Sequence, residues 1–265
     1  MKIGIVGCAG RMGQMLVREV LDNEGMVLSG GTDRIGSDAV GRDLGSLVGR
    51  AETGLAVGCD PSELFGASDV VIDFTVPAAT IQHVEYAAAN ACAMVIGTTG
   101  LTAEHEALIR QAATRIPIVR AANMSVGVNL LFAMVEKVAA TLGDDYDIEI
   151  VEKHHRHKVD APSGTALALG KAAAAGRAVN LDDVAQRVRD GITGPRKAGD
   201  IGFATLRGGD VVGDHDVIFA AEGERVILSH KASSRQVFAK GAIRAARWIQ
   251  GKPAGLYSMR DVLGL

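Results

Sequence analysis

The first 33 residues hold the sequence feature that most constrains the fold. Residues 2–6 predict a short strand, and a helical pattern then runs up to residue 23. Residues 26–31 predict a second strand, which leads into Asp33. Glycines occupy the turn between the first strand and the helix, residues 7–13. A strand, a glycine turn, a helix and a strand in this order predict a βαβ unit of a parallel sheet.

The glycine turn is typical of a dinucleotide-binding site, although its spacing is G-x-x-G-x-x-G because Ala9 replaces the usual middle glycine. Glycines let the backbone approach a pyrophosphate at a helix N-terminus, and an acid after the second strand binds the ribose hydroxyls. Asp33 lies twenty residues after Gly13, at the distance expected for that acid. The alternative is a glycine turn in an ordinary α/β unit. We expect the following residues of the turn to contact a nucleotide: Gly7, Cys8, Ala9, Gly10, Arg11 and Met12.

Arg34 bears on the identity of the nucleotide. An arginine beside the ribose-binding acid can hold a 2′-phosphate. Asp33 therefore favours NADH and Arg34 accommodates NADPH, so the pair predicts the use of both. The alternative for Arg34 is a solvated charge at the end of a strand.

Strand patterns alternate with helical patterns three more times, with strands at 70–74, 93–96 and 116–120 and helices at about 78–90, 102–114 and 126–142. This alternation predicts a parallel sheet with helices on both faces, and ligands bind outside the carboxyl ends of its strands. The residues expected there, besides the glycine turn, are Gly97, Thr98, Thr99, Ala121, Ala122, Asn123 and Met124. Residues 97–99 are expected on the nicotinamide side, the alternative being a plain turn.

A basic segment in the middle of the chain is the second informative feature. Residues 146–152 alternate apolar and polar side chains and predict a half-buried strand. Three histidines follow it within four positions, and Lys158 is close behind. Residues 160–164 have turn and cap chemistry, so a helix is expected to begin at Ser163 or Gly164. Because unpaired N–H groups at a helix start attract anions, the segment predicts a pocket for a carboxylated or phosphorylated molecule beside a proton donor.

Two other interpretations of this segment were weighed. A basic surface loop is the main competitor, and the helix start directly after the histidines favours the anion site. A metal site is disfavoured, because Lys153, Arg156 and Lys158 would repel a cation. We therefore expect no metal.

The last part of the chain predicts an α+β region. Residues 180–200 predict a loop with at most one short helix, and strands at 201–207, 211–220 and 225–231 predict an antiparallel meander. A final helix is expected at about 234–250. The fold class is therefore α/β, with a Rossmann-like parallel-sheet domain and an α+β domain that carries a mixed, largely antiparallel sheet. We place the dinucleotide-binding domain at 1–125 plus 235–265, and the substrate-binding and oligomerisation domain at 126–234.

Composition excludes several classes of protein. The net charge of -3 argues against bulk electrostatic binding of nucleic acid. No apolar run is expected to reach the ~20 residues of a membrane span, and the first residues lack the pattern of a signal peptide. Three cysteines far apart fit reduced thiols in the cytoplasm.

The chain resembles the 4-hydroxy-tetrahydrodipicolinate reductase family of lysine and diaminopimelate biosynthesis over nearly its whole length. The most specific motif is His-His-x-x-Lys-x-Asp-Ala-Pro-Ser-Gly-Thr-Ala, residues 154–166. The other segments that carry the resemblance are 6–13, 73–75, 97–100, 122–129, 201–205 and 230–235. This chain departs from many members of the family in having Asp33 in place of a glutamate. It departs from some members in having Val76 in place of an arginine near the nucleotide.

The resemblance implies reduction of a cyclic, unsaturated dicarboxylate by NADH or NADPH with loss of water. It implies that His154 is a proton donor and acceptor, that Lys158 is a second proton donor, and that His155 contacts the substrate. It implies that Gly164 and Thr165 hold a substrate carboxylate, and the helix start expected at Ser163 would take part in this binding. It further implies a homotetramer built through the sheet of the second domain.

Two competing functions were considered. Other two-domain dehydrogenases, of the aspartate or homoserine type, share the nucleotide half and lack the histidine motif. An NADH-binding redox sensor would need a segment that binds DNA or a partner, and no helix-turn-helix or basic stripe is visible.

Overall fold

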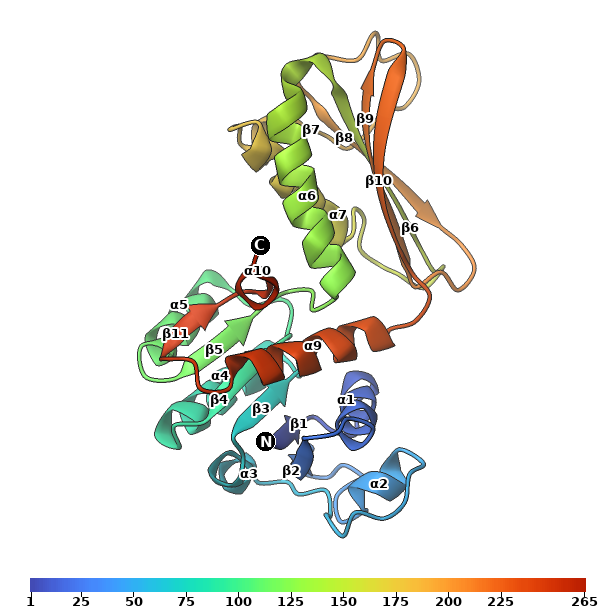
Figure 1. The fold of residues 1–265 in the computed structure, drawn as a ribbon. Helices are drawn as coiled ribbons and strands as arrows, with labels where there is room; N and C mark the ends of the chain where they lie inside the picture. Colours follow the sequence, from blue (N-terminus) through green and yellow to red (C-terminus); the bar gives the residue numbers. More distant parts are fainter. The chain divides into compact units, whose positions relative to one another are not determined.

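The computed structural model describes residues 1–265 and divides into two compact units (Figure 1). Unit 1 comprises residues 1–126 and 236–264, and unit 2 comprises residues 127–235 with residue 265. Each unit has a sheet and a core of its own.

Unit 1 is built on a six-stranded sheet in the order β11-β5-β4-β3-β1-β2, in which every pairing is parallel. The strands are β1 Lys2–Val6, β2 Val27–Thr32, β3 Val70–Asp73, β4 Ala93–Ile96, β5 Pro117–Arg120 and β11 Gly255–Tyr257. The chain leaves β1 toward β2 and returns to place β3 on the other side of β1, so the strand order reverses between β1 and β3. Ligands of doubly wound sheets bind at such a reversal. The predicted Rossmann-like sheet is confirmed.

Helices cover both faces of this sheet, as predicted. On one face Leu16 of α1 and Ile243 of α9 share a core cluster, and on the other Val84 of α4 and Ile109 of α5 share another. These helices are α1 Arg11–Leu21, α4 Pro77–Ala89, α5 Ala103–Ala113 and α9 Gln236–Ile249. The sequence interpretation missed the short elements α2 Leu44–Leu47, α3 Pro61–Ala67, β11 and α10 Met259–Leu263.

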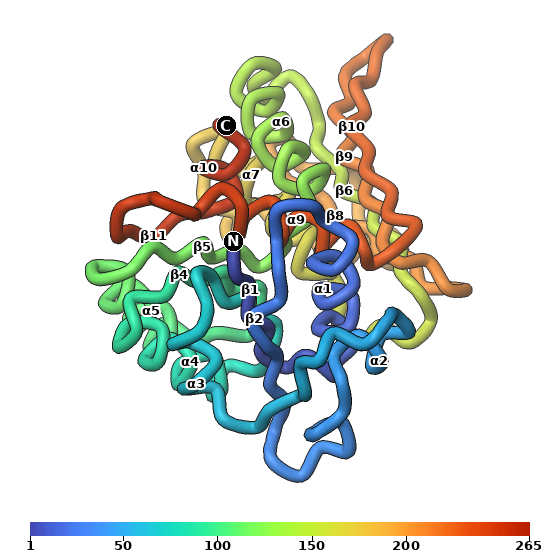
Figure 2. Tube along the Cα trace, turned by 60° about the horizontal axis from the view of Figure 1, so that its bottom comes forward, coloured from blue at the N-terminus to red at the C-terminus, as the bar shows by residue number.

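Unit 2 carries a five-stranded mixed sheet in the order β10-β9-β6-β8-β7. Its strands are β6 Asp147–His154, β7 Ala185–Gln186, β8 Ile201–Arg207, β9 Gly213–Ala221 and β10 Glu224–Ala232. β9 and β10 form an antiparallel hairpin (Figure 2). The predicted three-stranded meander was wrong, because β6 lies between β8 and β9 and pairs with β8 in parallel. The connection at 208–212 looked like a hairpin turn, but it carries the chain past the end of β6.

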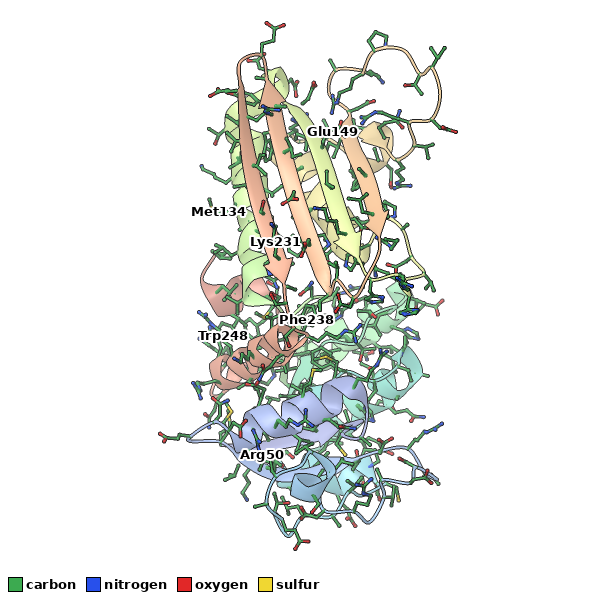
Figure 3. All side chains as sticks on the ribbon, turned by 90° about the vertical axis from the view of Figure 1, so that its right-hand side faces the viewer. Arg50, Met134, Glu149, Lys231, Phe238 and Trp248 are labelled. Atoms are coloured by element: carbon green, nitrogen blue, oxygen red, sulfur yellow. The ribbon has the colours of Figure 1, made fainter.

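One face of this sheet is covered by helices and the other is open. Val135 of α6 Val126–Leu142 and Leu169 of α7 Gly164–Gly176 pack on Ile150 and Phe203. Gly170 permits this approach, because a Cβ there would lie 2.5 Å from the Phe203 ring. Figure 3 looks at the strands from the side opposite α6. The remaining short elements are η1 Gly143–Asp145 and α8 Leu181–Val184.

The expectation that no apolar run reaches the length of a membrane span was wrong in the case of α6. The segment Val126–Asp145 has 20 residues and is long and apolar enough for a span by length and composition alone. Core helices of folded domains pass the same test, and Leu131, Val135 and Ala139 of this helix are buried in the core of unit 2.

Candidate active site

The inner face of β6 carries two buried ionisable side chains at its carboxyl end. Residues alternate between the two faces of a strand, so Ile148, Ile150, Glu152 and His154 all point toward α7. Glu152 is 1% exposed and His154 is 8% exposed. Buried charged groups of this kind are costly unless they are paired. Their partners therefore define the site.

Five donors surround the Glu152 carboxylate. Arg207 binds both carboxylate oxygens, at 2.7 and 2.8 Å. His154 Nδ1 lies 2.6 Å from Oε2, while the Ser163 amide and the Thr205 hydroxyl donate to Oε1 at 3.0 and 3.3 Å. Although burial alone would raise the pKa of Glu152, these hydrogen bonds, led by Arg207, lower it from 4.5 to about 2. Glu152 is therefore a fixed carboxylate at neutral pH.

Ser163 begins helix α7, as the sequence predicts. Its side chain accepts a hydrogen bond from the Ala166 amide at 3.1 Å, which is the geometry of an N-cap. Its hydroxyl also lies 3.1 Å from Nε2 of His215 on β9. Beyond it, a Cβ on Gly164 would meet nothing within 4 Å, so the helix start faces open space. Thr165 follows in the first turn.

His215 is a buried neutral neighbour of His154. The two rings are 5.1 Å apart in an edge-on arrangement. Burial is the main reason that the pKa of His215 is lowered from 6.5 to about 4, and the charge of His154 adds to it.

The loop after β6 holds the remaining predicted residues. Lys158 Nζ forms an ion pair with Asp160 at 2.7 Å. Nε2 of His155 lies 3.4 Å from a nitrogen of Arg235, and its Nδ1 is buried without a hydrogen-bond partner. Burial and the charge of Arg235 lower the pKa of His155. The rings of His155 and His157 lie 6.2 Å apart.

Sequence reasoning missed several residues of this site. Glu152 stands two positions before His154 on one strand, so the alternation of faces was a signal that could have found it. Thr205 and His215 are the direct neighbours of Glu152 on β8 and β9, and Arg207 faces His154. No signal in the sequence gave this strand order.

In unit 1 the glycine turn has the shape that the nucleotide motif requires. Gly7 has a φ of +66°, which favours glycine. A Cβ on Gly13 would lie 2.1 Å from the carbonyl oxygen of Gly7, so α1 can start this close to the turn only with glycine there. Asp33 accepts a hydrogen bond from the Ala9 amide at 3.1 Å, which places the predicted ribose-binding acid beside the turn.

A cavity of about 810 Å³ opens at the carboxyl ends of these strands. Its lining includes Gly7, Gly10, Asp33 and Arg34, together with residues of α4 and of the loop between β3 and α4. Arg11 is exposed and Met12 half-buried at the start of α1, whereas Cys8 is buried in the core and burial raises its pKa to about 12. Cys8 can therefore offer a nucleotide only its backbone.

The other predicted contacts do not line this cavity. Thr98 is buried, Gly97 packs on the Phe74 ring, and Thr99 is exposed. Ala121, Ala122 and Asn123 follow β5 at the surface or half-buried, while Met124 is buried in the core. These segments thus lie at the carboxyl ends of β4 and β5, as the parallel sheet requires.

A buried polar cluster missed by the sequence interpretation connects two of these segments. Asp73 is 0% exposed, and His83 Nδ1 lies 2.8 Å from its Oδ2. The hydroxyls of Thr75 and Thr98 donate to its Oδ1 at 2.6 and 3.2 Å. Burial opposes ionisation of Asp73, but the hydrogen bonds and charge of His83 outweigh it and lower the pKa. The cluster joins the loop after β3 to the loop after β4.

The residues of unit 1 fit a nicotinamide dinucleotide. The glycine turn leads into α1, a helix of 11 residues whose N-terminus can face a pyrophosphate, and Asp33 lies beside this turn, where a ribose-binding acid is expected. No group of three or more His, Cys, Asp or Glu side chains in the chain is arranged to hold a metal ion.

Comparison with known families assigns both units. Residues 1–124 match the family model "Dihydrodipicolinate reductase, N-terminus", and residues 127–263 match "Dihydrodipicolinate reductase, C-terminus". The chain belongs to the dihydrodipicolinate reductase family. Relatives named 4-hydroxy-tetrahydrodipicolinate reductase include one from Ruegeria pomeroyi, 59% identical over 99% of this chain and 98% of the relative. Another, from Brucella abortus, is 55% identical over 100% of this chain and 99% of its own length.

One solved structure agrees with this assignment to the dihydrodipicolinate reductases, and a second shares the fold. A dipicolinate-bound dihydrodipicolinate reductase from Paenisporosarcina is 25% identical, with a TM-score of 0.76 and 97% of each chain covered. Biliverdin reductase from Synechocystis, in complex with biliverdin and NADP+, has a TM-score of 0.55 at 13% identity, with 99% of this chain and 94% of that chain covered. The second likeness shows the fold alone.

Proposed function

We propose that this chain reduces 4-hydroxy-tetrahydrodipicolinate to tetrahydrodipicolinate with NADH or NADPH and loss of water, in diaminopimelate and lysine biosynthesis. The observation that carries the proposal is the match of both units to one reductase family, with relatives of that name at 55–59% identity. The nucleotide would be held in unit 1 and the dicarboxylate in unit 2.

In unit 1 the glycine turn would bind the pyrophosphate and Asp33 the ribose hydroxyls. Arg34 lines the same cavity and is exposed, so its guanidinium can donate hydrogen bonds to a 2′-phosphate. When bound, the nicotinamide supplies the hydride. The residues of 97–99 and 121–124 would complete the nicotinamide side of the site. The presence of both Asp33 and Arg34 supports the use of either cofactor.

In unit 2 the start of α7 would bind a carboxylate of the substrate through Ser163, Gly164 and Thr165. The open space at Gly164 and the exposed backbone of a helix N-terminus support this role. The buried, unpartnered Nδ1 of His155 supports a substrate contact there. Lys158 would exchange its ion pair with Asp160 for a substrate carboxylate.

The chemistry needs one hydride and one proton. Loss of the C4 hydroxyl as water leaves a conjugated imine, hydride adds to C4, and a proton is delivered to the neighbouring ring carbon. His154 and Lys158 are the candidate acids, and one positioned acid typically contributes ~10²–10⁴-fold. His154 is at the buried end of β6, beside the start of α7, which supports its choice.

We further propose a homotetramer in the cytoplasm. The open face of the sheet in unit 2 exposes Leu206 and Ile227, at 49% and 54%, which supports assembly through that face. Cys8, Cys59 and Cys92 are all free, which is consistent with a reducing compartment.

The reaction is tested by coupling to the preceding synthase, which makes the substrate from pyruvate and aspartate semialdehyde. We expect loss of NADH and of NADPH absorbance that depends on the synthase. The ratio of the two rates gives the cofactor preference. Folded protein that binds NADH and oxidises neither cofactor in this assay would overturn the proposed reaction and leave the nucleotide site standing.

A further inference from the structure

We infer that Glu152 is a positioning residue of this reaction, which orients His154 for proton transfer and ties it to the start of α7. The inference rests on the proposed function, because it assigns a partner to the proposed proton donor. Its basis is the set of contacts that one buried carboxylate makes on three sides: His154 on its own strand, Arg207 on β8 and Ser163 at the helix start.

Only one ring nitrogen of His154 is available to a ligand. Nδ1 of His154 donates a hydrogen bond of 2.6 Å to the Glu152 carboxylate, so this nitrogen carries a hydrogen and is not free to bind a ligand. Nε2 has no hydrogen-bond partner in the described chain. Gly213 leaves room beside it, since a Cβ at that position would lie 3.0 Å from Nε2. Nε2 is therefore the atom that can exchange a proton with a ligand.

Glu152 also supplies a fixed negative charge beside His154. The carboxylate of Glu152 stays ionised because Arg207 binds both of its oxygens, so the pKa of Glu152 is about 2. It can therefore stabilise the imidazolium of His154 without taking up the proton itself. His215, whose ring lies 5.1 Å from that of His154, has a pKa of about 4 and adds no second positive charge at neutral pH.

Hydrogen bonds also hold the Glu152 carboxylate rigidly in place. With Arg207 on both oxygens, and with the Ser163 amide and the Thr205 hydroxyl on Oε1, the carboxylate cannot rotate without breaking several hydrogen bonds. The Ser163 amide belongs to the residue that caps α7. Glu152 thus fixes the distance between the proton-transfer nitrogen and the helix start where a substrate carboxylate would bind. Carboxylates that orient a histidine at metal sites typically change activity or affinity ~10–100-fold when removed.

The test is a double-mutant cycle of Glu152→Gln and His154→Ala, with turnover and substrate KM measured for each variant. We expect Glu152→Gln to lower kcat ~10–100-fold. Its KM should change by less than about threefold, because the glutamine keeps the shape and the helix contact. If Glu152 acts through His154, the double variant should be no more than about threefold slower than His154→Ala alone.

Glu149→Gln is the matched control. Glu149 lies on the same strand and, like Glu152, is bound by arginine, in its case by the two side chains of Arg189 and Arg196. It lies on the opposite face of the strand from His154. A loss of kcat in this control equal to that of Glu152→Gln would assign the effect to the strand as a whole and overturn the inference.

Two other results would also overturn it. One is a Glu152→Gln enzyme with the wild-type kcat, and the other is a double variant whose loss is the product of the two single losses. Should Glu152→Gln fail to fold, Arg207→Lys replaces it in the cycle, because it keeps Glu152 and removes the two-point contact. A wild-type enzyme that does not reduce the synthase product would instead refute the proposed function, before the cycle is measured.

Discussion

At the scale of single residues, a buried carboxylate bound to a histidine occurs in each of the two units. Glu152 with His154, and Asp73 with His83, are buried carboxylates whose oxygen lies within 2.8 Å of a histidine Nδ1. Both carboxylates stand at or near the carboxyl end of a strand, where their hydrogen bonds also hold a neighbouring loop or helix start. A buried carboxylate is stable only with such partners, so each pair fixes the geometry of the chain around it.

The pair His154 and Lys158 gives the most direct test of the site at this scale. His154→Ala and Lys158→Ala should each lower turnover ~10²–10⁴-fold, because each removes a candidate acid. Substrate KM should rise more in Lys158→Ala, which also loses a charge-assisted contact. Steady-state kinetics with the coupled synthase measures both effects.

Lys153→Ala is the control for this pair, since Lys153 is a basic residue of the same segment on the other face of β6. It should leave turnover within about twofold of wild type. Unchanged turnover and KM in Lys158→Ala would remove Lys158 from the site.

His215 should make the free energy of unfolding depend on pH. Its pKa is lowered from 6.5 to about 4 in the folded chain, so the unfolded chain binds the proton first as the pH falls below 6.5. The folded state then loses stability between pH 6.5 and about 4, and the loss is absent above that window. In His215→Gln this contribution disappears. Between pH 7 and pH 5 the wild type should therefore lose about 2 kcal/mol more unfolding free energy than the variant.

Urea denaturation of wild type and His215→Gln at the two pH values measures this gap. Taking the difference removes the common contributions of the other titrating groups, including His155 and His230, whose pKa values are also lowered by burial. A gap of constant size at pH 7 and pH 5 would show that His215 titrates normally in the folded chain.

At the scale of the elements, the approach of α1 to the end of β1 depends on Gly13. A Cβ there would lie 2.1 Å from a backbone oxygen, which cannot move as a flexible side chain can. Gly13→Ala should cost about 1–3 kcal/mol of stability, since overpacking forces the backbone apart. It should also weaken NADH binding at least tenfold, because the helix N-terminus shifts. NADH fluorescence titration of the folded variant measures the second effect.

Gly208→Ala is a suitable control for Gly13→Ala, because a Cβ at Gly208 meets nothing within 4 Å. It should change neither NADH affinity nor stability by a measurable amount. Equal NADH affinity in Gly13→Ala and wild type would mean that the turn tolerates the added methyl group.

Elements were predictable from the sequence where their signals are local. The apolar run of β4, the cap of α7 at Ser163 and the extent of α6 are all as predicted, because each depends on residues within one segment. The order of strands in unit 2 was not predictable, since alternation gives the face of a strand and not its neighbours. For the same reason the sequence indicated His154 and Ser163 as site residues, while His215 and Arg207 emerged only when β9 and β8 were placed on either side of β6.

At the scale of the whole molecule, the open sheet face of unit 2 is the surface through which we expect copies of the chain to assemble. It presents exposed apolar side chains such as Leu206 and Ile227 beside charged ones, including Lys231 (Figure 3).

If four copies assemble through this face, light scattering after size-exclusion chromatography should give four times the chain mass of 27.5 kDa. Ile227→Asp places a charge in the centre of β10 and should reduce the mass to that of a dimer or monomer. Ile35→Asp, on an exposed loop residue of unit 1, is the control and should keep the wild-type mass. A wild-type chain that elutes as a monomer at micromolar concentration would contradict the tetramer and leave the proposed reaction untouched, because every residue proposed for binding and proton transfer belongs to one chain.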